Sequence, residues 1–106
     1  MENIVLFDSK GFNDYIYWQA TDKKITRRIN ELIKSIQREG PLQGFGKPEV
    51  LKGKGCYSRR IDDKNRLVYN FDSDNEVKRT FITSCREHYP KEISNAKKTL
   101  LKGLEL

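Results

Sequence analysis

Three polar residues in separated segments of the chain could together cleave a phosphodiester bond of RNA. Glu49 lies between Lys47 and Lys52, Arg66 follows in a later segment, and His88 is the only histidine. RNA carries its own nucleophile, the 2′-hydroxyl, so cleavage needs a general base, a general acid, fixed cations and in-line geometry. Glu49 is a candidate base. His88, with a reference pKa of about 6.5 for the side chain, can give or take a proton at neutral pH. Taken singly, each could equally be an ordinary surface or structural residue.

Further cations and aromatic residues could complete such a site. Arg59 and Arg60 are adjacent in an expected strand and therefore point to opposite faces, so only one of them can join Arg66. Tyr57 and Tyr89 could stack on unpaired bases. The alternatives are cross-strand ion pairs for the arginines and packing within the sheet for the tyrosines.

Size and charge suggest a single domain with a polyanionic partner. The chain has 106 residues, and its 21 Lys and Arg residues against 15 Asp and Glu residues give a net charge of +6. Nucleic acid is the first candidate partner, and a protein that is merely basic is the alternative. With no signal peptide and no apolar run of about 20 residues, we expect a cytoplasmic protein that does not enter a membrane.

The cysteine and histidine content argues against a structural metal. Cys56 and Cys85 with one histidine are too few for a zinc site, and two cysteines make no disulfide framework. We expect two reduced cysteines that act as small apolar residues, with a bridge between them left open. No metal and no cofactor are expected.

The first half of the chain predicts a strand followed by a helix hairpin. The apolar run 4–7 predicts a strand, and the pattern over residues 9–20 predicts a helix capped at Asp8-Ser9. Thr21-Asp22 should cap a second helix that ends at Gly40-Pro41. Its apolar face is formed by Ile25, Ile29, Leu32, Ile33 and Ile36.

The second half predicts an antiparallel meander after a glycine-rich loop over residues 43–55. Strands are expected at 57–62, 66–72 and 77–85, joined by short polar turns. The predicted fold is α+β: an antiparallel β-sheet with two helices on one face, and with the other face left for function.

A C-terminal extension follows the predicted domain of residues 1–90. Residues 91–106 should form an amphipathic helix, whose apolar side would comprise Ile93, Ala96, Leu100 and Leu104. Such a helix needs a surface, either on its own chain, on a dimer mate or on another protein; otherwise it would fray. On the open sheet face it would obstruct Glu49 and His88.

Taken together, six segments of the chain closely resemble the YoeB-type toxins of the RelE superfamily, from bacterial type II toxin–antitoxin systems. The resemblance spans roughly residues 3–89. The matching segments are Tyr15-x-Tyr17-Trp18-x-x-x-Asp22-Lys23, Ile29-Asn30-Glu31-Leu32-Ile33-Lys34, Gly46-Lys47-Pro48-Glu49-x-Leu51-Lys52, Ser58-Arg59-Arg60-Ile61, Arg66-Leu67-Val68-Tyr69 and Cys85-Arg86-x-His88-Tyr89.

The resemblance implies a RelE-like microbial ribonuclease fold and a metal-independent endoribonuclease that cuts mRNA in the ribosomal A site. It implies inhibition by a YefM-like antitoxin, contact with operator DNA only through that antitoxin, and it allows a homodimer. Two other functions remain open: a non-catalytic module that binds antitoxin or RNA in transcriptional control, and a ribosome-independent ribonuclease.

Residue roles follow from the same resemblance. Glu49 corresponds to the general base, His88 to the general acid and Arg66 to the arginine that stabilises the transition state. Tyr89 corresponds to a residue that orients the substrate. Lys52 and Arg60 correspond to phosphate-binding cations of the family. With Lys47 and Tyr57, which are suggested by the residues themselves, they make up the expected substrate-binding set.

Overall fold

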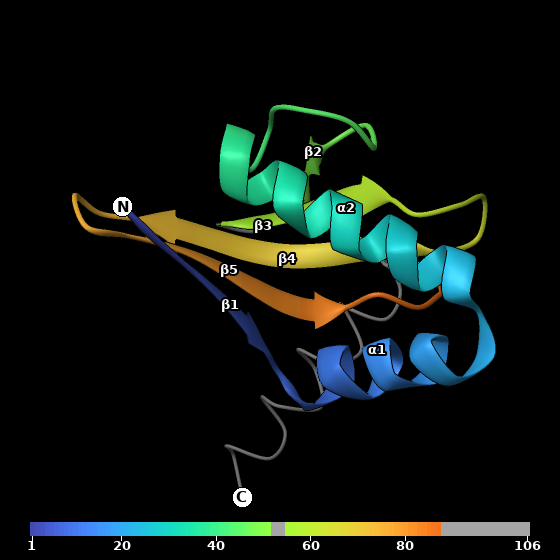
Figure 1. Cartoon of the computed structure of the whole chain (residues 1–106). Coiled ribbons are helices and arrows are strands. Elements are labelled where there is room, and N and C mark those ends of the chain that lie inside the picture. The colour runs from blue at the N-terminus through green and yellow to red at the C-terminus, as the bar shows by residue number, and fades with distance from the viewer. Residues whose placement is uncertain (52–54, 88–106) are drawn as a thin grey trace, which may run out of the picture.

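The computed structural model describes residues 1–51 and 55–87. Two helices and five strands follow one another along the chain (Figure 1). They are β1 (Glu2–Phe7), α1 (Ser9–Thr21), α2 (Lys23–Glu39), β2 (Glu49–Val50), β3 (Cys56–Arg60), β4 (Arg66–Ser73) and β5 (Val77–Ser84).

The helix hairpin begins and ends at the residues that the sequence predicts. The side chain of Asp8 accepts a hydrogen bond from the backbone N–H of Gly11, and that of Asp22 accepts from those of Lys24 and Ile25. These bonds satisfy N–H groups that have no partner within the helix. At the other end, Gly40 leaves α2 with a φ of 94°, a value that favours glycine.

The sheet has the strand order β1-β5-β4-β3-β2. The predicted antiparallel meander β3-β4-β5 is confirmed. The sheet as a whole is not antiparallel as predicted, because β1 lies parallel to β5 at its edge. The prediction that residues 43–55 are mostly loop is corrected at one point. Glu49 and Val50 form β2, because their backbones pair with Ser58 and Tyr57 of β3.

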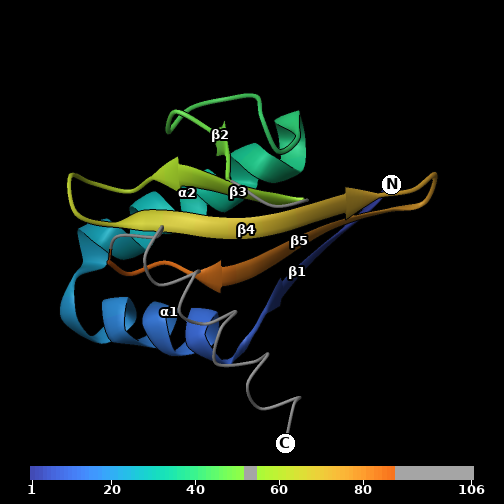
Figure 2. The ribbon, with the colours of Figure 1, turned by 180° about the vertical axis from the view of Figure 1, so that it is seen from behind.

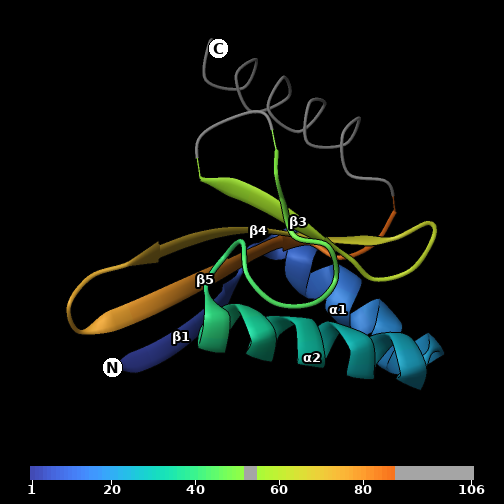
Figure 3. The same ribbon diagram turned by 90° about the horizontal axis from the view of Figure 1, so that it is seen from above.

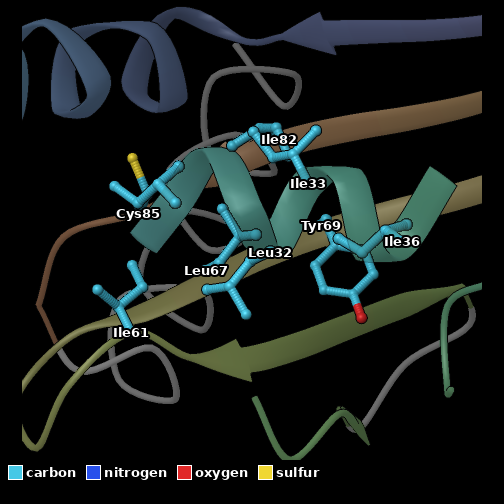
Figure 4. Packing of buried hydrophobic residues seen from close by; sticks show 9 residues of the cluster. Leu32, Ile33, Ile36, Ile61, Leu67, Tyr69, Ile82 and Cys85 are labelled. Atoms are coloured by element: carbon cyan, nitrogen blue, oxygen red, sulfur yellow. The ribbon is translucent and has the colours of Figure 1, made fainter. Parts of the chain in front are cut away.

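Both helices cover the same face of the sheet, as the view from above shows (Figure 3). The core between the layers contains Ile29, Leu32 and Ile36 of α2 together with strand residues such as Leu67, Tyr69 and Ile82 (Figure 4). Burying an apolar side chain of this size contributes about 1.5–3 kcal/mol to the stability of the fold, so packing of the hairpin stabilises the sheet.

The opposite face of the sheet carries no helix of the described residues; in Figure 2 the strands lie in front of α2. The α+β class is therefore confirmed. The predicted C-terminal helix and the domain boundary near residue 90 lie outside the described residues. Among the residues described, no helix is long and apolar enough to span a membrane.

Candidate active site

Glu49, Ser58 and Arg66 form a connected cluster on the open face. Arg66 Nη2 lies 2.7 Å from Glu49 Oε1, and Arg66 Nε donates a hydrogen bond of 3.0 Å to Ser58 Oγ. Ser58 Oγ in turn donates to Glu49 Oε1 at 3.4 Å. The Glu49 side chain is 47% exposed and that of Arg66 18%, so a proton acceptor and a guanidinium meet at the surface.

The strand register explains why these three residues meet. Glu49 pairs with Ser58 across β2 and β3, and Ser58 lies on the same face as Arg60, two residues along β3. Arg60 pairs with Arg66, the first residue of β4. Three neighbouring strands therefore bring residues from positions 49, 58 and 66 to one spot on the sheet.

The turn between β3 and β4 fixes where Arg66 begins its strand. Asp62 Oδ1 accepts hydrogen bonds from the backbone N–H groups of Lys64 and Asn65. Burial raises the pKa of Asp62, but these bonds and that from the Asn65 side chain outweigh it, and the net effect lowers the pKa. An ionised Asp62 therefore holds the turn.

Of the predicted substrate-binding cations, Arg60 and Lys47 are described. Arg60 lies on the open face, and its guanidinium pairs with Asp63 of the turn. Lys47 is exposed, with a φ of 50° at the point where the chain turns towards Glu49. The Arg60 side chain is 41% exposed, so its guanidinium is accessible from the solvent. Lys52 lies outside the described residues.

Tyr57 lies on the helix-covered face, away from the Glu49 cluster. Its ring stacks on Tyr69, with centroids 5.7 Å apart and an angle of 26° between the rings. It packs against the core, so we do not retain it as a base-stacking residue. Arg59 points to this covered face as well, which leaves Arg60 as the arginine of the pair that faces outward.

His88 and Tyr89 lie outside the described residues, but the segment before them is well anchored. Cys85 is fully buried; its N–H donates to Asp14 Oδ2 at 3.1 Å, and its carbonyl accepts from Trp18 Nε1 at 2.7 Å. The guanidinium of Arg86 lies 3.6 Å from the centre of the Tyr17 ring.

The side chain of Asn65 also anchors the segment that precedes His88. Its Oδ1 accepts a 2.7 Å hydrogen bond from the N–H of Glu87, which has a φ of 73°. Asn65 immediately precedes Arg66, so the last described residue of the chain is bonded next to the Glu49–Arg66 pair.

Two residues of this site were missed by sequence reasoning about function. Ser58 bridges the Glu49 carboxylate and the Arg66 guanidinium, and Asn65 holds the segment that leads to His88. The signal for Ser58 was its alternation with Arg59, which places it on the face of Arg60. Asn65 gave no signal beyond that of a turn residue, because its bond to Glu87 joins segments 22 residues apart.

Cys56 and Cys85 are not joined by a disulfide, and they differ in their surroundings. Cys85 is buried, whereas Cys56 is partly exposed on β3. Burial, reinforced by the Asp14 carboxylate, raises the pKa of Cys85 to about 12. Within residues 1–51 and 55–87, no three His, Cys, Asp or Glu side chains are grouped so that they could hold a metal ion.

Solved YoeB toxins share this fold. The YoeB dimer of Staphylococcus aureus superposes with a TM-score of 0.75 at 46% identity, covering 84% of this chain and all of that one. A YoeB chain in a heterotetrameric YoeB–YefM complex from the same organism gives a TM-score of 0.72 at 48% identity, with the same coverage. The sheet and the helix hairpin thus define the RelE-like toxin fold.

Sequence comparison narrows this class to one family. Residues 7–89 match the model of the YoeB-like toxin of bacterial type II toxin–antitoxin systems. Toxin YoeB of Streptomyces coelicolor is 48% identical over 87 residues, which are 80% of this chain and 98% of that protein. The chain belongs to the YoeB-like toxin family.

Proposed function

We propose that this protein is a metal-independent endoribonuclease toxin that cuts mRNA in the A site of the ribosome. The observation that carries the proposal is the Glu49–Ser58–Arg66 cluster on the open face, with Glu87 bonded beside it. That arrangement brings a carboxylate and a guanidinium together with the segment that leads into the only histidine.

The proposed reaction needs only groups of the protein and the RNA. The Glu49 carboxylate takes the proton of the 2′-hydroxyl, and the 2′-oxygen attacks the adjacent phosphorus. As that bond forms, the bond from phosphorus to the 5′-oxygen breaks, and protonated His88 gives its proton to the leaving oxygen. The products are a 2′,3′-cyclic phosphate, or the 3′-phosphate that its hydrolysis gives, and a 5′-hydroxyl.

Charge stabilisation is assigned to Arg66. Its guanidinium already lies at hydrogen-bonding distance from the Glu49 carboxylate, so a phosphate beside Glu49 is also within its reach. Fixed donors of this kind stabilise the charge that develops on phosphoryl oxygens without having to reorganise. Lys47, Lys52 and Arg60 are proposed to bind flanking phosphates, and Tyr89 to orient the substrate.

The proposed inhibitor is a YefM-like antitoxin. The similarity to the YoeB chain of a YoeB–YefM complex supports this partner, and the similarity to a YoeB dimer supports a homodimer as a further assembly. Contact with operator DNA is proposed only through the antitoxin. Cytoplasmic ribosomes and mRNA are then the natural targets of the released toxin.

Mapping RNA ends tests the proposal. A defined mRNA is incubated with the protein in the presence and in the absence of ribosomes, and the new ends are sequenced and chemically typed. We expect cuts at A-site codons only with ribosomes, leaving a 5′-hydroxyl and a cyclic phosphate or its hydrolysed 3′-phosphate. Equal cutting of free RNA would indicate a ribosome-independent ribonuclease, and no cutting in either case would favour a non-catalytic module.

A further inference from the structure

Arg59 is a fully buried charged residue that the proposed reaction does not use. It lies at 0% exposure on the helix side of β3, next to the outward-facing Arg60. Arginine is rarely buried unless its donors are satisfied. The acceptors that bind the N–H groups of Arg59 therefore indicate the role of this residue.

All five N–H groups of the Arg59 guanidinium are engaged by uncharged acceptors. Nε donates to Tyr69 Oη at 3.0 Å and Nη1 to Ser35 Oγ at 2.9 Å. The other three bonds go to backbone carbonyls of the segment that follows α2, namely those of Gly40, Gln43 and Phe45.

Tyr69 extends this network to a fourth carbonyl. Its hydroxyl accepts from Arg59 Nε and donates to the carbonyl of Pro41 at 2.6 Å. The carbonyls of residues 40, 41, 43 and 45 are thus all tied to two side chains of the sheet. We call Arg59 and Tyr69 the loop clamp.

The clamped loop leads directly to Glu49. It packs so closely on α2 that a Cβ on Gly46 would lie 2.5 Å from Leu32 Cδ2, and the carbonyl of Gly46 accepts a 2.6 Å hydrogen bond from Arg60 N. Only Lys47 and Pro48 separate Gly46 from Glu49. The loop clamp therefore determines where the chain enters β2.

We propose that Arg59, together with Tyr69, is the positioning residue of Glu49: it fixes loop 40–46 so that the carboxylate meets Ser58 and Arg66. This inference rests on the proposed function, in which Glu49 is the base. A lysine cannot replace Arg59, because one ammonium group has three donors and lacks the planar fork that reaches carbonyls on both sides.

Two variants weaken the clamp to different degrees. Tyr69→Phe removes one hydroxyl and keeps the ring that stacks on Tyr57, whereas Arg59→Lys removes most of the network. Tyr15→Phe is the matched control, because it also deletes a tyrosine hydroxyl with a 2.6 Å bond, here to Asn30 between the two helices. Misplacing a catalytic group by about 1 Å can lower a rate about 10²-fold.

Kinetics of mRNA cleavage on ribosomes give the first readout. We expect kcat to fall about tenfold in Tyr69→Phe and about 10²-fold in Arg59→Lys, with KM within about twofold of the wild type, while Tyr15→Phe keeps the wild-type kcat. In a Glu49→Ala background, Tyr69→Phe should cause no further loss, because its effect passes through the missing carboxylate. The same loss in both backgrounds, or a wild-type kcat in Tyr69→Phe, would overturn the proposal.

Hydrogen exchange of the full chain gives a readout that is independent of activity. Backbone amides of residues 42–50 should exchange at least about tenfold faster in Tyr69→Phe and in Arg59→Lys than in Tyr15→Phe, with the amides of β5 unchanged. Unchanged exchange in this segment would refute the clamp even if the enzyme were inactive. Wild-type protein that fails to cut mRNA, but whose variants show the faster exchange, would refute the proposed function and leave the clamp intact.

Discussion

Asn65 and Glu87 join two ends of the proposed site: the side-chain oxygen of Asn65 accepts a 2.7 Å hydrogen bond from the backbone N–H of Glu87. Asn65 is itself held by Asp62, to which its amide group donates. The turn that places Arg66 therefore also anchors the segment next to His88. One amide side chain thus couples the turn before Arg66 to Glu87, the residue that precedes His88.

We expect Asn65→Ala to lower kcat for mRNA cleavage about tenfold or more, because the His88 segment loses its anchor beside Arg66. Asn75→Ala, in the exposed turn between β4 and β5, is the control and should cleave as the wild type does. Steady-state kinetics on programmed ribosomes measure both, with thermal melting to confirm folding. Equal activity of the two variants would show that the anchor has no catalytic role.

The proposed catalytic residues predict large and separate losses. Glu49→Ala, Arg66→Ala and His88→Ala should each reduce cleavage at least about 10²-fold, the usual scale for acid–base groups and charge-stabilising donors. Ser58→Ala should cost less, because its hydroxyl only bridges Glu49 and Arg66. Glu76→Ala, on an exposed turn, is the control. Wild-type cleavage by His88→Ala would remove histidine from the mechanism.

Features that depend on neighbouring residues could be predicted from the sequence, whereas features that depend on contacts between distant segments could not. The caps at Asp8 and Asp22 and the meander follow from nearby residues, and all are confirmed. β2 could not be predicted, because two residues after Pro48 become a strand only by pairing with β3. Alternation along β3 showed that Tyr57 and Ser58 face opposite ways, but not which face the helices cover.

The burial of Arg59 could not be predicted from the sequence either. Its acceptors are mainly backbone carbonyls, which every residue carries, so no motif marks them. The same holds for the bond between Asn65 and Glu87. The family resemblance pointed to site residues, whereas the residues that position them emerge from tertiary contacts.

Binding to ribosomes should weaken steeply as salt increases, because bound lysines and arginines release phosphate counterions. Measured between about 50 and 200 mM KCl, the affinity should fall at least about tenfold. Lys47→Gln should reduce the slope against log salt by about one phosphate contact. Lys34→Gln, on the exposed side of α2, should leave the slope unchanged; the reverse result would place the RNA on the helix face.

The two thiols should differ in reactivity. The pKa of Cys85 is raised to about 12 and its side chain is buried, so at pH 8 it holds very little thiolate. In native protein treated with iodoacetamide, mass spectrometry should find Cys56 alkylated well before Cys85. The rate at Cys85 should rise with pH or on unfolding. Cys56→Ser checks the assignment, and rapid labelling of native Cys85 at pH 8 would contradict its burial.

A chain that ends at Tyr89 should cleave mRNA at least as fast as the full chain, because the family match ends at that residue. Faster cleavage would mean that residues 90–106 restrain the site, as expected if their apolar side covers the open sheet face. Loss of stability or of an oligomer, measured by melting and by mass in solution, would instead indicate docking on the body or on a partner. Slower cleavage with unchanged folding would contradict the domain boundary.

The parallel pairing of β1 with β5 has a consequence for how the toxin is made. Glu2 pairs with Val77 and Phe7 with Ile82. β1 is therefore synthesised early but cannot pair until β5 has also been synthesised. Contacts this distant in sequence form late, because a long loop must close before they are gained. A nascent chain that stops before β5 lacks the strand on which both β1 and the helix hairpin rest. We therefore expect an interrupted translation product to be harmless to the ribosome that is making it, with toxicity appearing only in the finished molecule.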